Sequence, residues 1–112
     1  MADAIIELEV YRELQETAGA DFVEELVDTF LEEAPGMLAD LRAAHMAGSD
    51  ERFRRAAHSL KSNSLTFGAA ALAGQARALE LGGAGADAEA ALSALDKAYA
   101  AARERLLELR RG

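Results

Sequence analysis

The chain has 112 residues, enough for one domain with a modest core, and 51% of its residues are hydrophobic, with alanine prominent and one proline. Twenty acidic and twelve basic side chains give a formal charge of −8, which disfavours binding to a polyanion such as nucleic acid. The absence of cysteine excludes a disulfide framework, a thiolate zinc site and a cysteine nucleophile.

The N-terminal residues allow two interpretations. Ile6, Leu8 and Val10 alternate with acidic residues as in a strand, whereas Val10, Leu14 and Ala18 fit one face of a helix. A strand needs a partner, and the sequence offers no second strand. We therefore predict a short helix here.

A long apolar stripe begins near Asp21 and ends by Gly48. Its members recur at helical spacing: Val23, Leu26, Phe30, Met37 and Leu41. Pro35 interrupts the stripe because its ring crowds the carbonyl of Leu31. Two helices with a break at "APG" are one interpretation. Because the stripe keeps its phase across the proline, we predict a single kinked helix instead.

Two shorter helices follow. Ser49 or Asp50 caps a helix that runs to about Phe67, and Gly68 fits the left-handed position that commonly ends a helix. The next helix stops at the flexible glycine-rich turn 82–85.

The C-terminal segment has the clearest periodicity. We predict a helix from about Ala88 to about Arg110, with Asp87 as its N-cap. Its apolar residues are spaced three and four positions apart: Leu92, Leu95, Tyr99, Ala102, Leu106 and Leu109. Together the segments predict an all-α fold, an antiparallel four-helix bundle with a short additional N-terminal helix, as a single domain over residues 1–112.

The chain shows no membrane or export signal. No apolar run approaches the roughly 20 residues that cross a bilayer. The N-terminus lacks the basic region and long apolar core of a secretory signal. We expect a cytoplasmic monomer that binds neither membrane nor nucleic acid.

The stretch "AAHSLKSNSLTFGAA" contains His58, whose direction follows from its neighbours. On a helical wheel Phe53, Leu60 and Phe67 take the inward positions. His58 then lies in the middle of the solvent face. The alternatives are a buried, hydrogen-bonded histidine, which would turn the helix against its pattern, and an ordinary surface histidine.

The surroundings of His58 suit a phosphoryl group. The stretch "ERFRRAAHSLK" carries a net charge of +3 in a chain of −8, and Arg54, Arg55 and Lys61 lie within one turn of the imidazole. Leu65 is apolar on the same exposed face and is a candidate for partner docking. A neutral imidazole has one nitrogen free to attack phosphorus. The sequence has no Walker or glycine-rich nucleotide loop and no recognisable acidic metal cluster, so we expect no autonomous kinase reaction and no metal site.

These residues resemble the histidine-containing phosphotransfer domains of two-component phosphorelays. The segment "AHSLKSNSLTFGA" matches the family's histidine, a hydrophobic residue two positions later, lysine at three, small polar residues and glycine at ten. The preceding segment "DFVEELVDTFLEEAPGMLADLRAA" resembles the long helix that comes before the phosphohistidine helix.

The resemblance implies a phosphoryl carrier rather than an enzyme. His58 would accept phosphate, on Nε2, from a phospho-aspartate of a response-regulator receiver domain and pass it to another receiver. Lys61 would stabilise the phosphoryl oxygens, and Gly68 would end the helix so that the next one turns back. The chain itself would need no cofactor, because the receiver would bring Mg²⁺. A hybrid sensor histidine kinase is the other implied partner.

One position departs from the family pattern. Many members have glycine directly after the lysine, where this chain has Ser62. Serine is small enough to leave the ring accessible, and its hydroxyl can bond the phosphate. The alternative function is a helical adaptor that binds a receiver or kinase without carrying phosphate.

Overall fold

The computed structural model describes residues 5–83, 85 and 87–111, which form five helices and no strand. The helices are α1 (Leu8–Ala18), α2 (Ala20–Met46), α3 (Asp50–Thr66), α4 (Ala70–Gly82) and α5 (Ala88–Arg111). The all-α prediction is confirmed, and so is the choice of a helix over a strand at the N-terminus.

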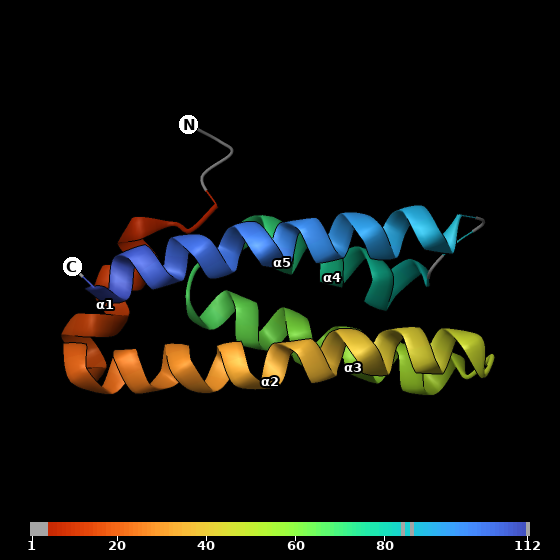
Figure 1. Cartoon of the computed structure of the whole chain (residues 1–112), viewed down its shortest axis with the longest axis horizontal. Coiled ribbons are helices and arrows are strands. Elements are labelled where there is room, and N and C mark those ends of the chain that lie inside the picture. The colour runs from red at the N-terminus through yellow and green to blue at the C-terminus, as the bar shows by residue number, and fades with distance from the viewer. Residues whose placement is uncertain (1–4, 84, 86, 112) are drawn as a thin grey trace.

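The four longer helices run in alternating directions around a shared core (Figure 1). Each of them contacts the next in sequence, and α5 returns to pack against α2. The short helix α1 packs against α2 and α3. In Figure 1, α1 lies at the same end of the molecule as the C-terminus, whereas the α2–α3 turn and the end of α4 lie at the other.

Pro35 lies within α2 and does not end it. The proline is on the exposed side, while its neighbour Ala34 is fully buried. Phe30 and Leu41 anchor the two halves of the helix in the core on either side of it. Packing of both halves therefore compensates for the missing backbone hydrogen bond. The single-helix interpretation is confirmed.

Aromatic contacts fix the end of α3 against the rest of the bundle. The Phe30 ring of α2 lies 5.4 Å from that of Phe67, which follows α3, and 6.2 Å from that of Tyr99 in α5. All three side chains are buried. The helix that carries His58 is thus held from inside, with its outer face left to solvent.

Side-chain caps start two of the helices as expected. Ser49 accepts a hydrogen bond on Oγ from the Arg52 amide at 3.3 Å, so α3 begins at Asp50. Asp87 accepts one from the Ala90 amide at 3.1 Å. Both predicted N-caps are confirmed, Ser49 being the one chosen at α3.

Gly68 ends α3 in the left-handed conformation, with φ of +76°. Its carbonyl accepts a hydrogen bond from the Glu7 amide at 2.8 Å. A Cβ at this position would stand 2.9 Å from both the Glu7 carbonyl oxygen and the Val10 Cβ. The position therefore requires glycine for two reasons, the backbone angle and the close approach of the N-terminal segment.

Within the described residues, no helix combines the length and the hydropathy that a membrane span requires.

Candidate functional site

His58 projects from the outer face of α3. Its side chain is 58% exposed, whereas the Leu60 and Phe53 side chains of the same helix are buried in the core. The predicted exposure of the imidazole is confirmed. A partner can reach the ring from solvent.

A carboxylate from the next helix holds one side of this ring. Glu80 of α4 places Oε2 2.6 Å from Nδ1 of His58. Its other oxygen, Oε1, lies 2.8 Å from Nζ of Lys61. The Glu80 and Lys61 side chains are only 15% and 22% exposed. One carboxylate thus bridges the imidazole and the ammonium group and fixes both against α4.

The charge state of Glu80 decides which ring nitrogen is free. The hydrogen bond from Lys61 and then that from His58 lower the pKa of Glu80 below its ordinary value of 4.5. An ionised carboxylate only accepts hydrogen bonds, so Nδ1 of His58 carries the proton that it donates to Glu80. In the neutral ring the lone pair then lies on Nε2. This hydrogen bond therefore leaves Nε2 as the ring nitrogen with a free lone pair.

Sequence reasoning missed Glu80. The signal was present in the geometry of the α3–α4 hairpin, which pivots at Gly68. His58 and Lys61 precede the pivot by ten and seven residues, and Glu80 follows it by twelve. Positions at similar distances from a tight turn between antiparallel helices face each other. Counting residues from Gly68 along both helices would therefore have identified Glu80 as a candidate neighbour of His58.

The other predicted site residues lie on the same surface with looser contacts. Arg54 and Ser62 are exposed, and Leu65 is 54% exposed. Arg55 lies 3.5 Å from Glu51, with both side chains largely in solvent. Such an exposed pair contributes little to stability, so the Arg55 guanidinium remains available to a partner.

The arrangement suits a nucleophile rather than a metal centre. Among residues 5–83, 85 and 87–111, no group of three or more His, Cys, Asp or Glu side chains is placed to hold a metal ion. The site instead offers an exposed imidazole that shares one carboxylate with an ammonium group. Such an arrangement is chemically competent to accept a phosphoryl group.

The comparisons with known proteins agree with that chemistry. The Hpt domain family model matches residues 25–105. Among solved structures, histidine-containing phosphotransfer protein B (HptB) from Pseudomonas aeruginosa PAO1 is similar, with a TM-score of 0.89 and 30% sequence identity over 97% of this chain and 96% of that chain. A search of curated proteins found no significant match.

Hpt domains carry phosphoryl groups in phosphorelays rather than acting as enzymes, and they interact with receiver domains and histidine kinases. The family match covers most of the chain, and the structural similarity extends over nearly all of it. The chain belongs to the Hpt domain family and has a histidine phosphotransfer role in phosphorelays.

Proposed function

We propose that His58 is the phosphorylated residue, and that it accepts the phosphoryl group from a receiver-domain phospho-aspartate and passes it to a second receiver domain. The observation that carries this proposal is the pairing of an exposed imidazole with a hydrogen bond from Nδ1 to Glu80 at 2.6 Å. That bond leaves the lone pair of Nε2 free to act as the nucleophile.

In the transfer, a bond forms between Nε2 and phosphorus while the bond between phosphorus and the aspartyl oxygen breaks. The receiver's aspartate leaves as a carboxylate, and the Nδ1 proton stays on the ring. The ring gains positive charge as the new bond forms, and the Glu80 carboxylate stabilises that charge. The return step to a second receiver reverses these bond changes.

Lys61 has two roles in this proposal. In the unphosphorylated chain, Nζ of Lys61 lies 2.8 Å from Oε1 of Glu80 and so keeps the carboxylate in position to bond the His58 ring. Once His58 is phosphorylated, three phosphoryl oxygens carry negative charge beside the same ammonium group, and Lys61 donates to them. The Ser62 hydroxyl, exposed on the same face, donates a further hydrogen bond.

The surrounding surface docks the partner. Arg54 and Arg55 attract the acidic receiver site, and Leu65 supplies apolar contact. Gly68 keeps the α3–α4 hairpin tight, so that Glu80 stays opposite the histidine. The receiver brings Mg²⁺ and the remaining catalytic groups, so the chain needs no cofactor of its own. We place it in the cytoplasm as a monomeric single domain over residues 1–112, phosphorylated through receivers coupled to a hybrid sensor histidine kinase.

Incubation with a phosphorylated receiver domain from the same organism and Mg²⁺ tests the proposal. Wild-type chain is expected to acquire an acid-labile, base-stable label, and His58→Gln none. His45→Gln is the matched control, because His45 is an exposed histidine at the end of α2; it should be labelled like the wild type. Receiver binding without any transfer to the wild type would favour the adaptor alternative.

A further inference from the structure

The N-terminal segment holds the α3–α4 turn from outside. The Gly68 carbonyl accepts hydrogen bonds from the amides of Glu7 and Ala70, both at 2.8 Å. Val10 lies against the same glycine, where a Cβ would stand 2.9 Å from the Val10 Cβ. Ile6 is 3% exposed and so anchors the segment in the core. We call Ile6, Glu7 and Val10 the N-terminal clamp.

The turn itself does little to fix the direction of α4. Gly68 has φ of +76° and no Cβ, so its backbone has more conformational freedom than that of any other residue type. Backbone hydrogen bonds to Ser64 and Leu65 tie Gly68 and Ala69 to α3. Helix α4, in contrast, begins after Ala69 without a side-chain cap. The direction in which α4 leaves the turn therefore depends on what holds Gly68 from outside.

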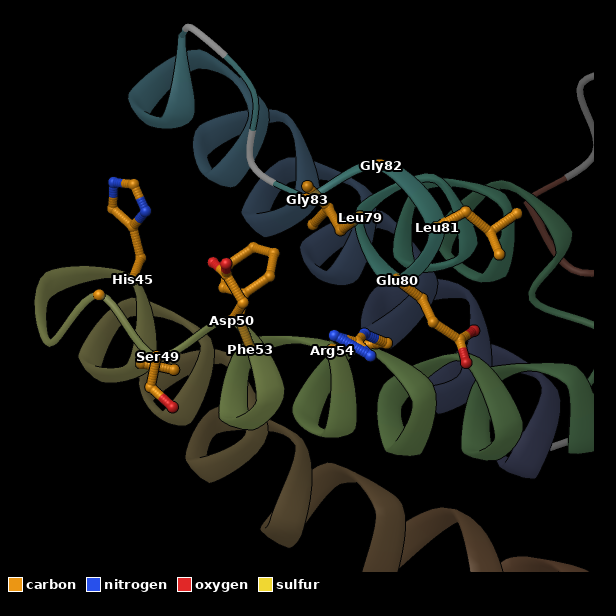
Figure 2. Close-up of a pocket in the computed structure, with 12 residues that line it drawn as sticks. His45, Ser49, Asp50, Phe53, Arg54, Leu79, Glu80, Leu81, Gly82 and Gly83 are labelled. Carbon is orange, nitrogen blue, oxygen red and sulfur yellow. The ribbon is translucent and has the colours of Figure 1, made fainter.

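Core packing holds α4 against the bundle but restrains its position along α3 less. Its buried side chains are Leu72, Ala73, Ala76 and Leu79. Two of them are single methyl groups, which form shallow ridges and interlock little with a neighbouring helix. From Leu79 onward a hollow of about 700 Å³ separates the end of α4 from the start of α3, and Glu80, which lines it, points toward α3 (Figure 2). The position of α4 along α3 is therefore set mainly at the Gly68 turn.

The histidine site tolerates little change in that position. Glu80 Oε2 lies 2.6 Å from Nδ1 of His58. Lengthening by about 1 Å takes this contact past the limit of a side-chain hydrogen bond. His58 is ten residues from Gly68, about 15 Å along α3, and at that distance a rotation of about 4° about the turn produces a displacement of about 1 Å. A small change of angle at Gly68 therefore breaks the bond that orients the ring.

We propose that the N-terminal clamp positions the His58 ring, because it fixes the turn angle at which Glu80 meets Nδ1. Ile6, Glu7 and Val10 are thus positioning residues for phosphoryl transfer, and they act from the turn, about 15 Å from the ring. The inference rests on the proposed role of His58 as the phosphoryl acceptor. It gives the segment that leads into α1 a role in the site as well as in the fold.

Two proline substitutions at adjacent positions provide a matched test. Glu7 has φ of −75°, which proline adopts, so Glu7→Pro removes the amide that donates to Gly68 without forcing the backbone. Leu8 is the first residue of α1, where proline is favoured because the amide has no partner within the helix. Leu8→Pro therefore leaves both bonds to the Gly68 carbonyl in place. Far-UV circular dichroism establishes that each variant is folded.

The position of the proton on the His58 ring reports the contact with Glu80 directly. Long-range ¹H–¹⁵N correlation spectra of the unphosphorylated chain at about pH 8.5, where an ordinary histidine is neutral, distinguish a proton on Nδ1 from one on Nε2. Glu7→Pro should lower the ratio of Nδ1–H to Nε2–H by about three- to tenfold, because it weakens a hydrogen bond to a charged acceptor. Leu8→Pro should change this ratio by less than about twofold.

A wild-type ratio in Glu7→Pro would overturn the proposal. Equal losses in Glu7→Pro and Leu8→Pro would overturn it too, because the effect would then belong to α1 as a whole. If Glu7→Pro does not fold, Ile6→Ala replaces it, with Leu14→Ala as the control. Both side chains pack in or against the core, but only Ile6 belongs to the clamp. Ile6→Ala should lower the ratio more than Leu14→Ala does, and equal ratios would again overturn the proposal.

The spectra separate this inference from the proposed function. They require neither a receiver domain nor phosphate, so they test the clamp whether or not His58 accepts a phosphoryl group. An unlabelled His58 in the transfer assay, together with the expected ratios, would refute the proposed function alone. A labelled His58 with a wild-type ratio in Glu7→Pro would refute the clamp alone.

Discussion

The bridge from Glu80 to His58 and Lys61 yields a graded prediction for the transfer rate. Glu80→Gln keeps the shape and an acceptor for the Nδ1 proton but removes the charge. Glu80→Ala removes both. Lys61→Ala keeps the carboxylate and removes the ammonium group that holds it. We expect the wild type to transfer phosphate fastest, Glu80→Gln more slowly and Glu80→Ala most slowly.

The magnitude follows from the contacts. Hydrogen bonds to a charged group are about twice as strong as neutral ones, and the 2.6 Å contact to Nδ1 is of this kind. Because the His58 side chain is 58% exposed, solvent screens part of the effect. We therefore expect Glu80→Gln to slow transfer by about three- to tenfold. Glu80→Ala also loses the orientation of the ring, so we expect it to slow transfer by about 30-fold relative to the wild type.

These rates can be measured in single-turnover transfer from a phosphorylated receiver. The chain is present at a saturating concentration, and samples are quenched rapidly. Far-UV circular dichroism establishes that each variant is folded. If Glu80→Ala retains full helicity and transfers phosphate at the wild-type rate, Glu80 is not the residue that orients His58. Faster transfer by Glu80→Gln than by the wild type would refute the role of its charge.

Three further outcomes are expected. Lys61→Ala should shorten the lifetime of the phosphorylated chain without loss of helicity; a collapse of helicity would instead make Lys61 structural. Gly68→Ala, whose Cβ would lie 2.9 Å from the Glu7 carbonyl oxygen at φ of +76°, should lower the free energy of unfolding by about 2 kcal/mol in urea titrations; an unchanged midpoint would contradict the close approach. The lowered pKa of Glu80 means that its contacts stabilise the fold above its ordinary pKa of 4.5, and that this stabilisation disappears as pH falls through the lowered value. The stability difference between the wild type and Glu80→Gln should therefore shrink with acidification below pH 4.5; a constant difference would contradict the ionised bridge.

Helices α2 and α5 were predictable because each carries a long apolar stripe whose helical period survives local interruptions. Pro35 shows this well, since packing of Phe30 and Leu41 on either side keeps α2 continuous. The outward direction of His58 followed from the same logic, because the core positions of α3 were already taken by large apolar side chains.

The Glu80 bridge was not predictable from periodicity alone. It depends on the register between two helices, which is set by the turn at Gly68 and by packing across the α3–α4 contact rather than by either helix separately. The second role of Gly68, room for the N-terminal segment, also depends on a contact between distant parts of the chain. A pattern within one segment assigns a face of the helix, whereas a contact between two segments also requires their register across the turn.

We propose that His58 carries the phosphoryl group on Nε2. Long-range ¹H–¹⁵N correlation spectra of ¹⁵N-labelled chain, recorded before and after incubation with a phosphorylated receiver domain and Mg²⁺, test this assignment. We predict that phosphorylation moves the Nε2 resonance of His58 and leaves the proton on Nδ1. Phosphorus on Nδ1, or on any residue other than His58, would contradict the account.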